Sequence, residues 1–261
     1  MDEIEEFLLE DNEVKFLEKM IEDGRIGFKD GENLRYEETF ASWKPVSSFK
    51  EQDTDIDEDE LELVEKELKP IDELMQQYFA TGNNLKQVLF VIADFGKGKS
   101  VFLRHHAAQL AKKYLQTGEG KFPVYFNLRE YKKYSSEVQF GVISHYLAIE
   151  FLIDVNTDNF RQKNCIFLID SLYESGELNK ANINAVIALI RNIQLLDPIK
   201  CKNNQIVITS RPFDDGLEEL LRNYDPYLIK DKNNRKIPQL LSIFGFKKSQ
   251  FNGWLTSNLT I

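Results

Sequence analysis

The sequence predicts an α/β fold in which a parallel sheet is covered by helices on both faces. From residue 87 onward, apolar segments of strand length alternate with segments whose apolar residues recur at helical spacing. The strand segments are apolar throughout, as is typical of parallel strands that are buried on both faces. The chain has 261 residues, of which 42% are hydrophobic, so it can bury a large core without disulfide bonds.

Four central strands and the helices between them can be placed in order. The strands are QVLFVIA, PVYFNL, NCIFLID and QIVITS, at residues 87–93, 123–128, 164–170 and 205–210. Helices are expected over residues 100–114, 138–152 and 179–196. An acidic helix (DDGLEELLRN), short strands around YLIK and QLLSIF, and a helix from about residue 247 follow.

The residues before the first strand are predicted to form an appendage and a linker. Helical spacing predicts a helix that Gly24 ends, followed by a hairpin that turns at Asp30-Gly31. An acidic stretch then leads to two helices that are broken at Pro70. The predicted units are a helix and hairpin unit (1–45), an acidic linker with helices (46–86), the core (87–230) and a C-terminal extension of the core (231–261).

The net charge of −10 is concentrated in one stretch. Between Glu51 and Glu73 there are twelve acidic residues and two lysines, so the rest of the chain is balanced. Direct binding of nucleic acid is not expected, because phosphate neutralisation needs clustered Lys and Arg. The acidic stretch is interpreted as a solvated linker, and the alternative is a contact for a basic partner surface.

Cysteine usage and hydropathy predict a cytoplasmic protein. The two cysteines, Cys165 and Cys201, form no CxxC pair and no metal-ligand spacing, which favours a reducing compartment. No apolar run reaches the roughly 18 residues that a membrane span needs, and the N-terminal residues are acidic, unlike a signal peptide. No contact with a membrane is therefore expected.

The segment ADFGKGKS, residues 93–100, has the features of a phosphate-binding loop between a strand and a helix. Gly96 and Gly98 let backbone amides approach phosphate oxygens, and Lys99 is expected to reach the β- and γ-phosphates. Ser100 would offer its hydroxyl to Mg²⁺. The side chain of Lys97 is expected to face solvent or a neighbouring subunit. The predicted nucleotide contacts are Asp94, Phe95, Gly96, Lys97, Gly98, Lys99, Ser100 and Val101.

Two further strand ends carry candidate site residues. Asp170 ends the strand NCIFLID and is expected to hold Mg²⁺, and Glu174 could orient or deprotonate an attacking water. Arg211 follows QIVITS, where a guanidinium can reach a γ-phosphate. The alternative is that the two carboxylates are capping and loop residues and that Arg211 is a surface residue beside a turn. His105 and His106 are expected to be a surface pair on the helix rather than metal ligands.

The three motifs ADFGKGKS, FLIDSLYES and VITSRP, with FNLREY between the first two, resemble the NACHT family of the STAND class of P-loop NTPases. The resemblance covers roughly residues 87–212. It implies an ATP-binding, AAA+-like sheet of order 5-1-4-3-2 with the phosphate loop on the central strand. It also implies that ATP or dATP drives oligomerisation. In this family the NTPase domain commonly lies between an effector region and a sensor region, and many bacterial members serve in defence against phage.

The sequence departs from this family in its second motif. Tyr173 stands where the family usually has an acidic residue, and Glu174 remains to position water, so slow hydrolysis is expected. A fragment that holds the NTPase domain, or an unusually minimal member of the family, is also expected, because the winged-helix and repeat regions of the family have no counterpart in these residues.

We therefore expect a regulatory ATPase that binds ATP with Mg²⁺ and self-associates on activation, together with effector and sensor partners that the sequence does not name. One alternative is a scaffold that holds ADP or ATP without turnover. A small-molecule kinase fits less well, because the helix DDGLEELLRN is acidic where such enzymes carry an arginine-rich lid. Trp43 or Phe49 could stack on the adenine, and the alternative is that both belong to the core.

Overall fold

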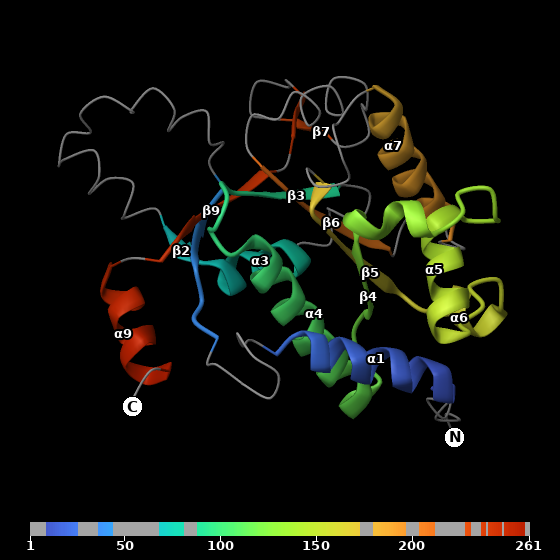
Figure 1. Cartoon of the computed structure of the whole chain (residues 1–261), viewed down its shortest axis with the longest axis horizontal. Coiled ribbons are helices and arrows are strands. Elements are labelled where there is room, and N and C mark those ends of the chain that lie inside the picture. The colour runs from blue at the N-terminus through green and yellow to red at the C-terminus, as the bar shows by residue number, and fades with distance from the viewer. Residues whose placement is uncertain are drawn as a thin grey trace.

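A computed structural model of the chain shows a central seven-stranded sheet with helices packed around it (Figure 1). A separate two-stranded sheet consists of β7 (Leu228–Lys230) and β8 (Lys236–Pro238). The residues that the structure describes are 9–25, 36–43, 68–80, 88–172, 180–196, 204–211, 228–230, 236–238, 240–246 and 248–258.

The strands of the main sheet lie in the order β2-β1-β9-β3-β6-β5-β4. The five strands from β9 to β4 are parallel to one another, whereas β1 is antiparallel to β9 and β2 is antiparallel to β1. The bounds are β1 (Phe40–Ser42), β2 (Lys69–Pro70), β3 (Val88–Ile92), β4 (Phe122–Asn127), β5 (Cys165–Asp170), β6 (Gln205–Ser210) and β9 (Leu240–Gly245).

The α/β class and the mostly parallel sheet are confirmed, but the strand order of the sheet differs from the expected five-stranded order 5-1-4-3-2. The difference is that β1 and β2 extend the sheet beyond β9. These strands have three and two residues, which is too short for an alternating pattern of apolar and polar residues to be recognised. The pairing of β1 with β9 also joins segments that are about 200 residues apart, as its register of Phe40 with Gly245 shows.

The helices agree with the predicted ones within a few residues wherever the structure describes them. Two short elements are not predicted, the 3₁₀ helix η3 and α6, because single turns carry little periodicity. The predicted hairpin turn and the acidic helix DDGLEELLRN lie outside the described residues, and the domain boundaries stay predictions. The bounds are α1 (Asp11–Asp23), α3 (Ile71–Ala80), α4 (Lys99–Thr117), η3 (Leu128–Lys133), α5 (Gly141–Phe151), α6 (Asp158–Gln162), α7 (Lys180–Leu195) and α9 (Lys248–Asn258).

Helix α1 lies across α4, as the blue and green ribbons in Figure 1 show. It begins with a capping box in which the side chains and backbone amides of Glu10 and Glu13 are paired. It ends at Gly24, as the sequence predicts. A Cβ atom at Gly24 would collide with the Cβ of Ala108 on α4, so the glycine allows the close approach of the two helices.

The core lies around the parallel strands, and its buried character continues to the strand ends. Every residue of β3, β5 and β6 is buried, including the polar residues at the carboxyl ends of two of these strands. Asp170 and Ser210 are each 1% exposed and Thr209 is fully buried. Buried polar side chains need partners, so these three residues mark the end of the sheet at which a site can form.

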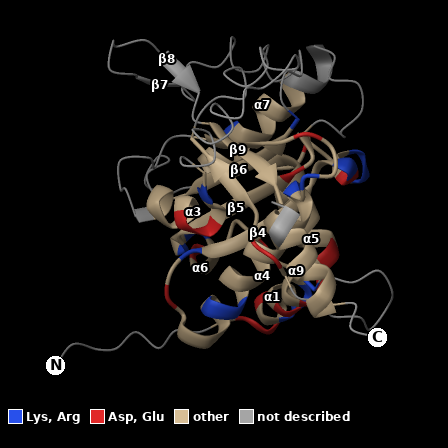
Figure 2. Ribbon diagram, turned by 90° about the vertical axis from the view of Figure 1, so that its left-hand side faces the viewer, with Lys and Arg blue, Asp and Glu red and all other residues tan. Residues whose placement is uncertain are grey.

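Basic and acidic residues are interspersed over the described ribbon, as the blue and red segments in Figure 2 show. The described helices include none with a run that is both long and apolar enough to cross a membrane.

Candidate functional site

The predicted site residues follow the carboxyl ends of three neighbouring parallel strands. The register pairs Ile92 at the end of β3 with Ser210 at the end of β6. β6 in turn pairs with β5, which ends at Asp170. The loop of residues 93–98 therefore starts beside the segments that follow β5 and β6. In open α/β sheets this edge is where ligands bind.

The loop turns tightly into α4 by using two glycines in a left-handed conformation. Gly96 has a φ of 75° and Gly98, the residue that caps α4, has a φ of 87°. The amide of Phe102 donates a 2.8 Å hydrogen bond to the carbonyl of Gly98, so the helix begins at the loop itself. The free amides of the first helical turn and the helix dipole thus favour an anion at this place.

Lys99 is the cation of the loop. Its Nζ donates hydrogen bonds of 2.5 Å and 2.9 Å to the carbonyls of Ala93 and Asp94. Burial lowers the pKa of Lys99, the charge of Arg211 lowers it further, and Asp94 and Asp170 oppose the shift. The positive charges of Lys99 and Arg211 are therefore close enough to repel each other, and a bound anion would reduce that repulsion.

A cavity of about 340 Å³ lies between this loop and the ends of β5 and β6. We call it the loop cavity. It brings together six of the predicted loop residues and the predicted arginine. It also adds three residues to which no role was assigned from the sequence. The lining residues are Phe95, Gly96, Gly98, Lys99, Ser100, Val101 and Arg211, together with Arg129, Ser171 and Ser210.

Arg211 lies at the rim of the loop cavity beside an exposed aromatic ring. Its guanidinium carbon is 5.6 Å from the centroid of the Phe95 ring, which is a cation–π distance. Phe95 is 80% exposed, which is unusual for a phenylalanine. The two residues come from the loop after β3 and the segment after β6, so a ligand in the cavity would contact both.

Three other predicted residues do not line the loop cavity. Asp94 and Lys97 have exposed side chains. The Cδ of Lys97 lies 3.0 Å from the position that a Cβ atom would take at Gly245, so its aliphatic stem runs along the end of β9. Asp170 lies in an adjoining cavity, where Ser100 also lies, so the structure brings the two predicted Mg²⁺ ligands to one place.

Asp170 is held by two hydroxyl groups. Thr209 Oγ1 donates a 2.5 Å hydrogen bond to its Oδ1, and the Tyr125 hydroxyl donates one of 3.1 Å to its Oδ2. Thr209 Oγ1 also accepts a 2.8 Å hydrogen bond from the amide of Ser171. Burial and the charge of Asp170 raise the pKa of Tyr125, so its hydroxyl stays protonated and remains a donor. The carboxylate is thus fixed in orientation before any ligand binds.

Some predictions fall on residues outside the described ranges. Glu174, Tyr173 and Phe49 belong to this group, so the proposed water-positioning carboxylate stays a prediction. Trp43 is half-buried, and its ring centroid lies 6.3 Å from that of Tyr78 in the core. That packing supports the alternative in which Trp43 is a core residue.

The prediction that the two histidines of α4 form a surface pair is wrong. Both are half-buried among aromatic rings. His105 stacks on Tyr36 with 3.8 Å between ring centroids, and His106 lies 5.9 Å from Phe79 and 5.7 Å from Phe102. Burial lowers the pKa of His106 to about 4, so it is neutral at pH 7.

Several residues that the structure places at the site had no role assigned from the sequence. The polar run TSR at the end of an apolar strand is a signal that places Thr209 and Ser210 beside Arg211, but only the arginine was given a role. Tyr125 and Arg129 carry no such signal. Tyr125 is one of several aromatic residues in β4, and Arg129 follows two residues after β4 ends, within η3.

The residues present fit a nucleotide phosphate with Mg²⁺. The Oγ of Ser210 is buried and has no hydrogen-bond partner, although Ser210 lines the loop cavity. Buried hydroxyls are rarely left without partners, so a ligand that offers an acceptor or a donor would supply the missing hydrogen-bond partner of Ser210. Among the described residues, no group of three or more His, Cys, Asp or Glu could hold a metal ion. Mg²⁺ needs no such group, because it binds through one or two protein ligands together with phosphates.

Relatives do not supply an assignment. No protein-family model matches the sequence, and no curated protein is significantly similar to it. The function must therefore be argued from the loop, the cavity and the strand ends that the structure brings together.

Proposed function

We propose that the chain binds ATP with Mg²⁺ in the loop cavity and acts as a nucleotide-dependent switch for self-association, with slow hydrolysis. One observation carries the proposal. Lys99, Arg129 and Arg211 line a single cavity at the N-terminus of α4, where backbone amides already favour an anion. Three cations around one cavity suit a polyphosphate better than an uncharged ligand.

Each residue has a distinct role in this proposal. The loop amides and Lys99 hold the β- and γ-phosphates, and Arg211 with Arg129 contacts the γ-phosphate. Ser100 and Asp170 hold Mg²⁺. The buried network around Asp170 supports this role, because a metal ligand works best when its orientation is fixed by a second set of residues.

The arrangement of the parallel strands supports the nucleotide proposal. Numbered among themselves along the chain, the five parallel strands β9, β3, β6, β5 and β4 run 5-1-4-3-2. That is the order which the resemblance to NACHT NTPases implies for the strands around the phosphate loop. The same resemblance is the only basis for extending the proposal to a bacterial antiviral system in the cytoplasm with separate effector and sensor regions.

Fluorescent nucleotide binding tests the proposal directly. Lys99→Ala is expected to weaken the binding of a fluorescent ATP analogue in the presence of Mg²⁺ by at least about tenfold, because a charge-assisted contact is lost. Lys112→Ala is the matched control, since Lys112 is an exposed lysine of the same helix that does not line the loop cavity. Equal affinities for the wild-type chain and the Lys99 variant would refute the proposal.

A second measurement separates the switch from a scaffold that holds nucleotide without turnover. The wild-type chain is expected to hydrolyse ATP slowly, and Glu174→Ala is expected to abolish hydrolysis while it leaves binding intact. Light scattering in ATP and in ADP then shows whether mass increases only with ATP. Nucleotide binding without turnover or change of mass would favour the scaffold.

A further inference from the structure

A second cavity of about 330 Å³ adjoins the loop cavity, and we call it the side pocket. It shares Ser100, Arg129 and Ser171 with the loop cavity, so the two open onto the same strand ends. The rest of its wall comes from α1, α4, β4, η3, α5 and the end of β5. Charged and aromatic residues of this wall include Asp23, Arg104, Tyr125, Glu130, Tyr146 and Asp170.

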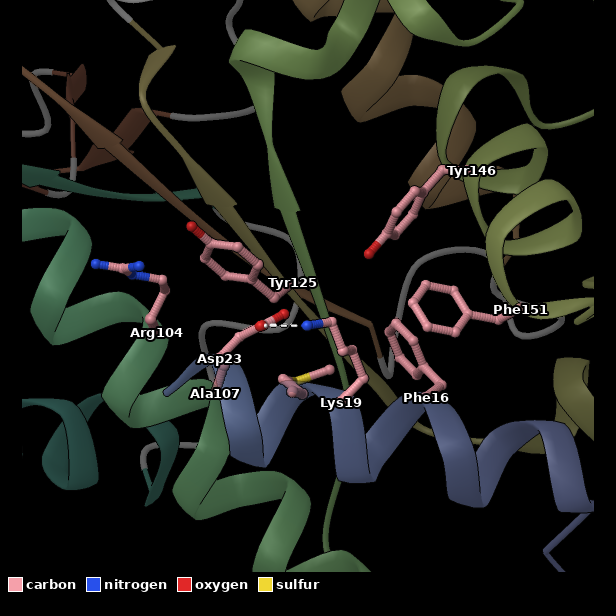
Figure 3. Close-up of a pocket in the computed structure, with 9 residues that line it drawn as sticks. Phe16, Lys19, Asp23, Arg104, Ala107, Tyr125, Tyr146 and Phe151 are labelled. Carbon is pink, nitrogen blue, oxygen red and sulfur yellow. Dashed lines mark hydrogen bonds and ion pairs between the residues drawn. The ribbon is translucent and has the colours of Figure 1, made fainter. Parts of the chain in front are cut away.

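Three aromatic residues, Tyr125, Phe126 and Tyr146, lie in the otherwise largely polar wall of the side pocket. A small cavity of about 20 Å³ lies next to it and has Asp23, Arg104, Tyr125 and Tyr146 in common with it (Figure 3). Figure 3 shows the rings of Tyr125, Tyr146, Phe16 and Phe151 arranged around this space. Aromatic side chains that line a concave site favour a planar, apolar part of a ligand.

The acidic residues of the side pocket already have cationic or hydrogen-bonding partners. Asp23 pairs with Lys19 at 2.7 Å, as the dashed line in Figure 3 marks. Glu130 pairs with Lys133 at 3.2 Å. Asp170 accepts hydrogen bonds from Thr209 and Tyr125. Asp23 and Glu130 are therefore paired with lysines, whereas Asp170 is held by two hydroxyl donors.

Arg104 differs from these carboxylates, because its guanidinium has no ion-pair partner among the described residues. Its Nε donates a 3.3 Å hydrogen bond to the carbonyl of Ser100. A guanidinium presents five N–H donors in a planar fork, so most of this donor capacity is open to a ligand. Phosphate and carboxylate groups match that fork best.

Tyr125 links the side pocket to the nucleotide site. Its ring lines the pocket, and its hydroxyl donates to Asp170, the proposed Mg²⁺ ligand. A ligand that packs on this ring would change the position or the rigidity of the hydroxyl, and through it the orientation of the carboxylate. The pocket also includes Asp23 of α1, so its occupant would contact α1 and α4 together.

We propose that the side pocket binds a small molecule that carries an anionic group and an aromatic ring, and that this molecule changes the affinity of the loop cavity for Mg²⁺–nucleotide. The anionic group lies against Arg104, and the ring lies against Tyr125 and Tyr146 in the side pocket. The binding site stands without the nucleotide, whereas the coupling rests on the proposed function.

Binding is tested with phenyl phosphate as the probe and Lys99→Ala as the background, because that variant weakens the competing phosphate site of the loop. Calorimetric titration is expected to show one saturable site, weakened at least about tenfold by adding Arg104→Gln. Lys112→Gln, an exposed cation on the same helix, is the matched control and leaves the affinity unchanged. Benzyl alcohol, which has no charge, does not bind. A parallel titration with benzoate shows whether the site takes carboxylates as well as phosphates.

The absence of saturable binding, or binding that is unaffected by Arg104→Gln, would refute the proposed binding site.

Coupling is tested in the chain with Lys99 intact. Phenyl phosphate is expected to change the Mg²⁺-dependent affinity for a fluorescent ATP analogue by at least about fivefold. In Tyr125→Phe this effect disappears while phenyl phosphate still binds. If the analogue does not bind at all, the proposed function fails. The titration in the Lys99→Ala background then still decides whether the side pocket binds phenyl phosphate.

Discussion

Thr209 Oγ1 donates a 2.5 Å hydrogen bond to Asp170 Oδ1 and so joins the ends of β6 and β5. The same oxygen accepts a hydrogen bond from the amide of Ser171, the residue that follows β5. Ser171 has a φ of 65°, a left-handed conformation that costs free energy for a residue with a Cβ atom. One buried hydroxyl thus satisfies a buried carboxylate and holds a strained residue at the wall of both cavities.

Thr209→Val is expected to destabilise the chain by about 1–3 kcal/mol, although the side chain keeps its shape. The substitution leaves a buried carboxylate oxygen and a buried amide without their partner, and that desolvation cost is not recovered. Urea unfolding measures the loss. Thr209→Ser keeps the hydroxyl and serves as the control, so equal stabilities of the serine and valine variants would contradict the role of this hydrogen bond.

Gly24→Ala is expected to destabilise the chain by about 1–3 kcal/mol through overpacking between α1 and α4. Gly24 has an ordinary helical φ of −78°, so an alanine there strains nothing in the backbone. The cost arises from its Cβ, which would collide with Ala108 and lie 3.0 Å from the carbonyl of Arg104.

A double-mutant cycle isolates this contact. Ala108→Gly removes the colliding Cβ, so Gly24→Ala is expected to cost much less in that background than in the wild-type chain. Thermal or urea unfolding of the four proteins gives the coupling free energy. An equal cost in both backgrounds would mean that the close approach of the helices does not explain the glycine.

The central strands could be predicted because each of them is a nearly continuous run of apolar residues. Segments such as CIFLID and QIVITS are apolar enough to be recognised as strands buried on both faces. Once the strands are parallel, their carboxyl ends must lie at one edge, so the proximity of the loop, Asp170 and Arg211 follows from topology. β1 and β2 could not be predicted, because two or three residues show no period and their partner β9 lies far away in the chain.

The hydrogen bonds between site residues could not be predicted from the sequence for a different reason. The contact between Tyr125 and Asp170 depends on β4 lying next to β5 with Asn127 in register with Asp170. That register places Tyr125 two residues before the strand end, on the face where its hydroxyl meets the carboxylate. Neither the neighbour nor the register of a strand can be read from its own residues.

Asp72 is expected to make stability fall as the pH rises from about 4 to about 7. Burial raises the pKa of Asp72 to about 6, and the charge of Glu38 adds to the shift. An unfolded aspartate titrates near 3.9, so between the two values the folded chain holds the proton more tightly. The stabilisation is complete below pH 4 and is lost as the pH rises through 6.

Asp72→Asn removes this titration. The variant is expected to melt at a higher temperature than the wild-type chain at pH 8, with a difference that shrinks towards pH 4. Asp158→Asn is the control, since Asp158 is an exposed aspartate that also lies in the first turn of a helix and loses the same interaction with the helix dipole. A difference in melting temperature that is independent of pH would contradict the assignment.

Ser210→Ala is expected to have opposite effects on the free chain and on ligand binding. In the free chain the Ser210 Oγ is buried without a partner, so its removal is expected to leave stability unchanged or to raise it by up to about 1 kcal/mol. In the nucleotide complex the same hydroxyl would contact the phosphates, so the affinity for Mg²⁺–ATP is expected to fall about five- to tenfold. Ser144→Ala, at a buried serine of α5, controls for the loss of a buried hydroxyl away from the loop cavity and leaves the affinity unchanged. Urea unfolding and fluorescence titration on the same samples give both quantities. A variant that loses stability without losing affinity would show that Ser210 serves the fold and not the ligand.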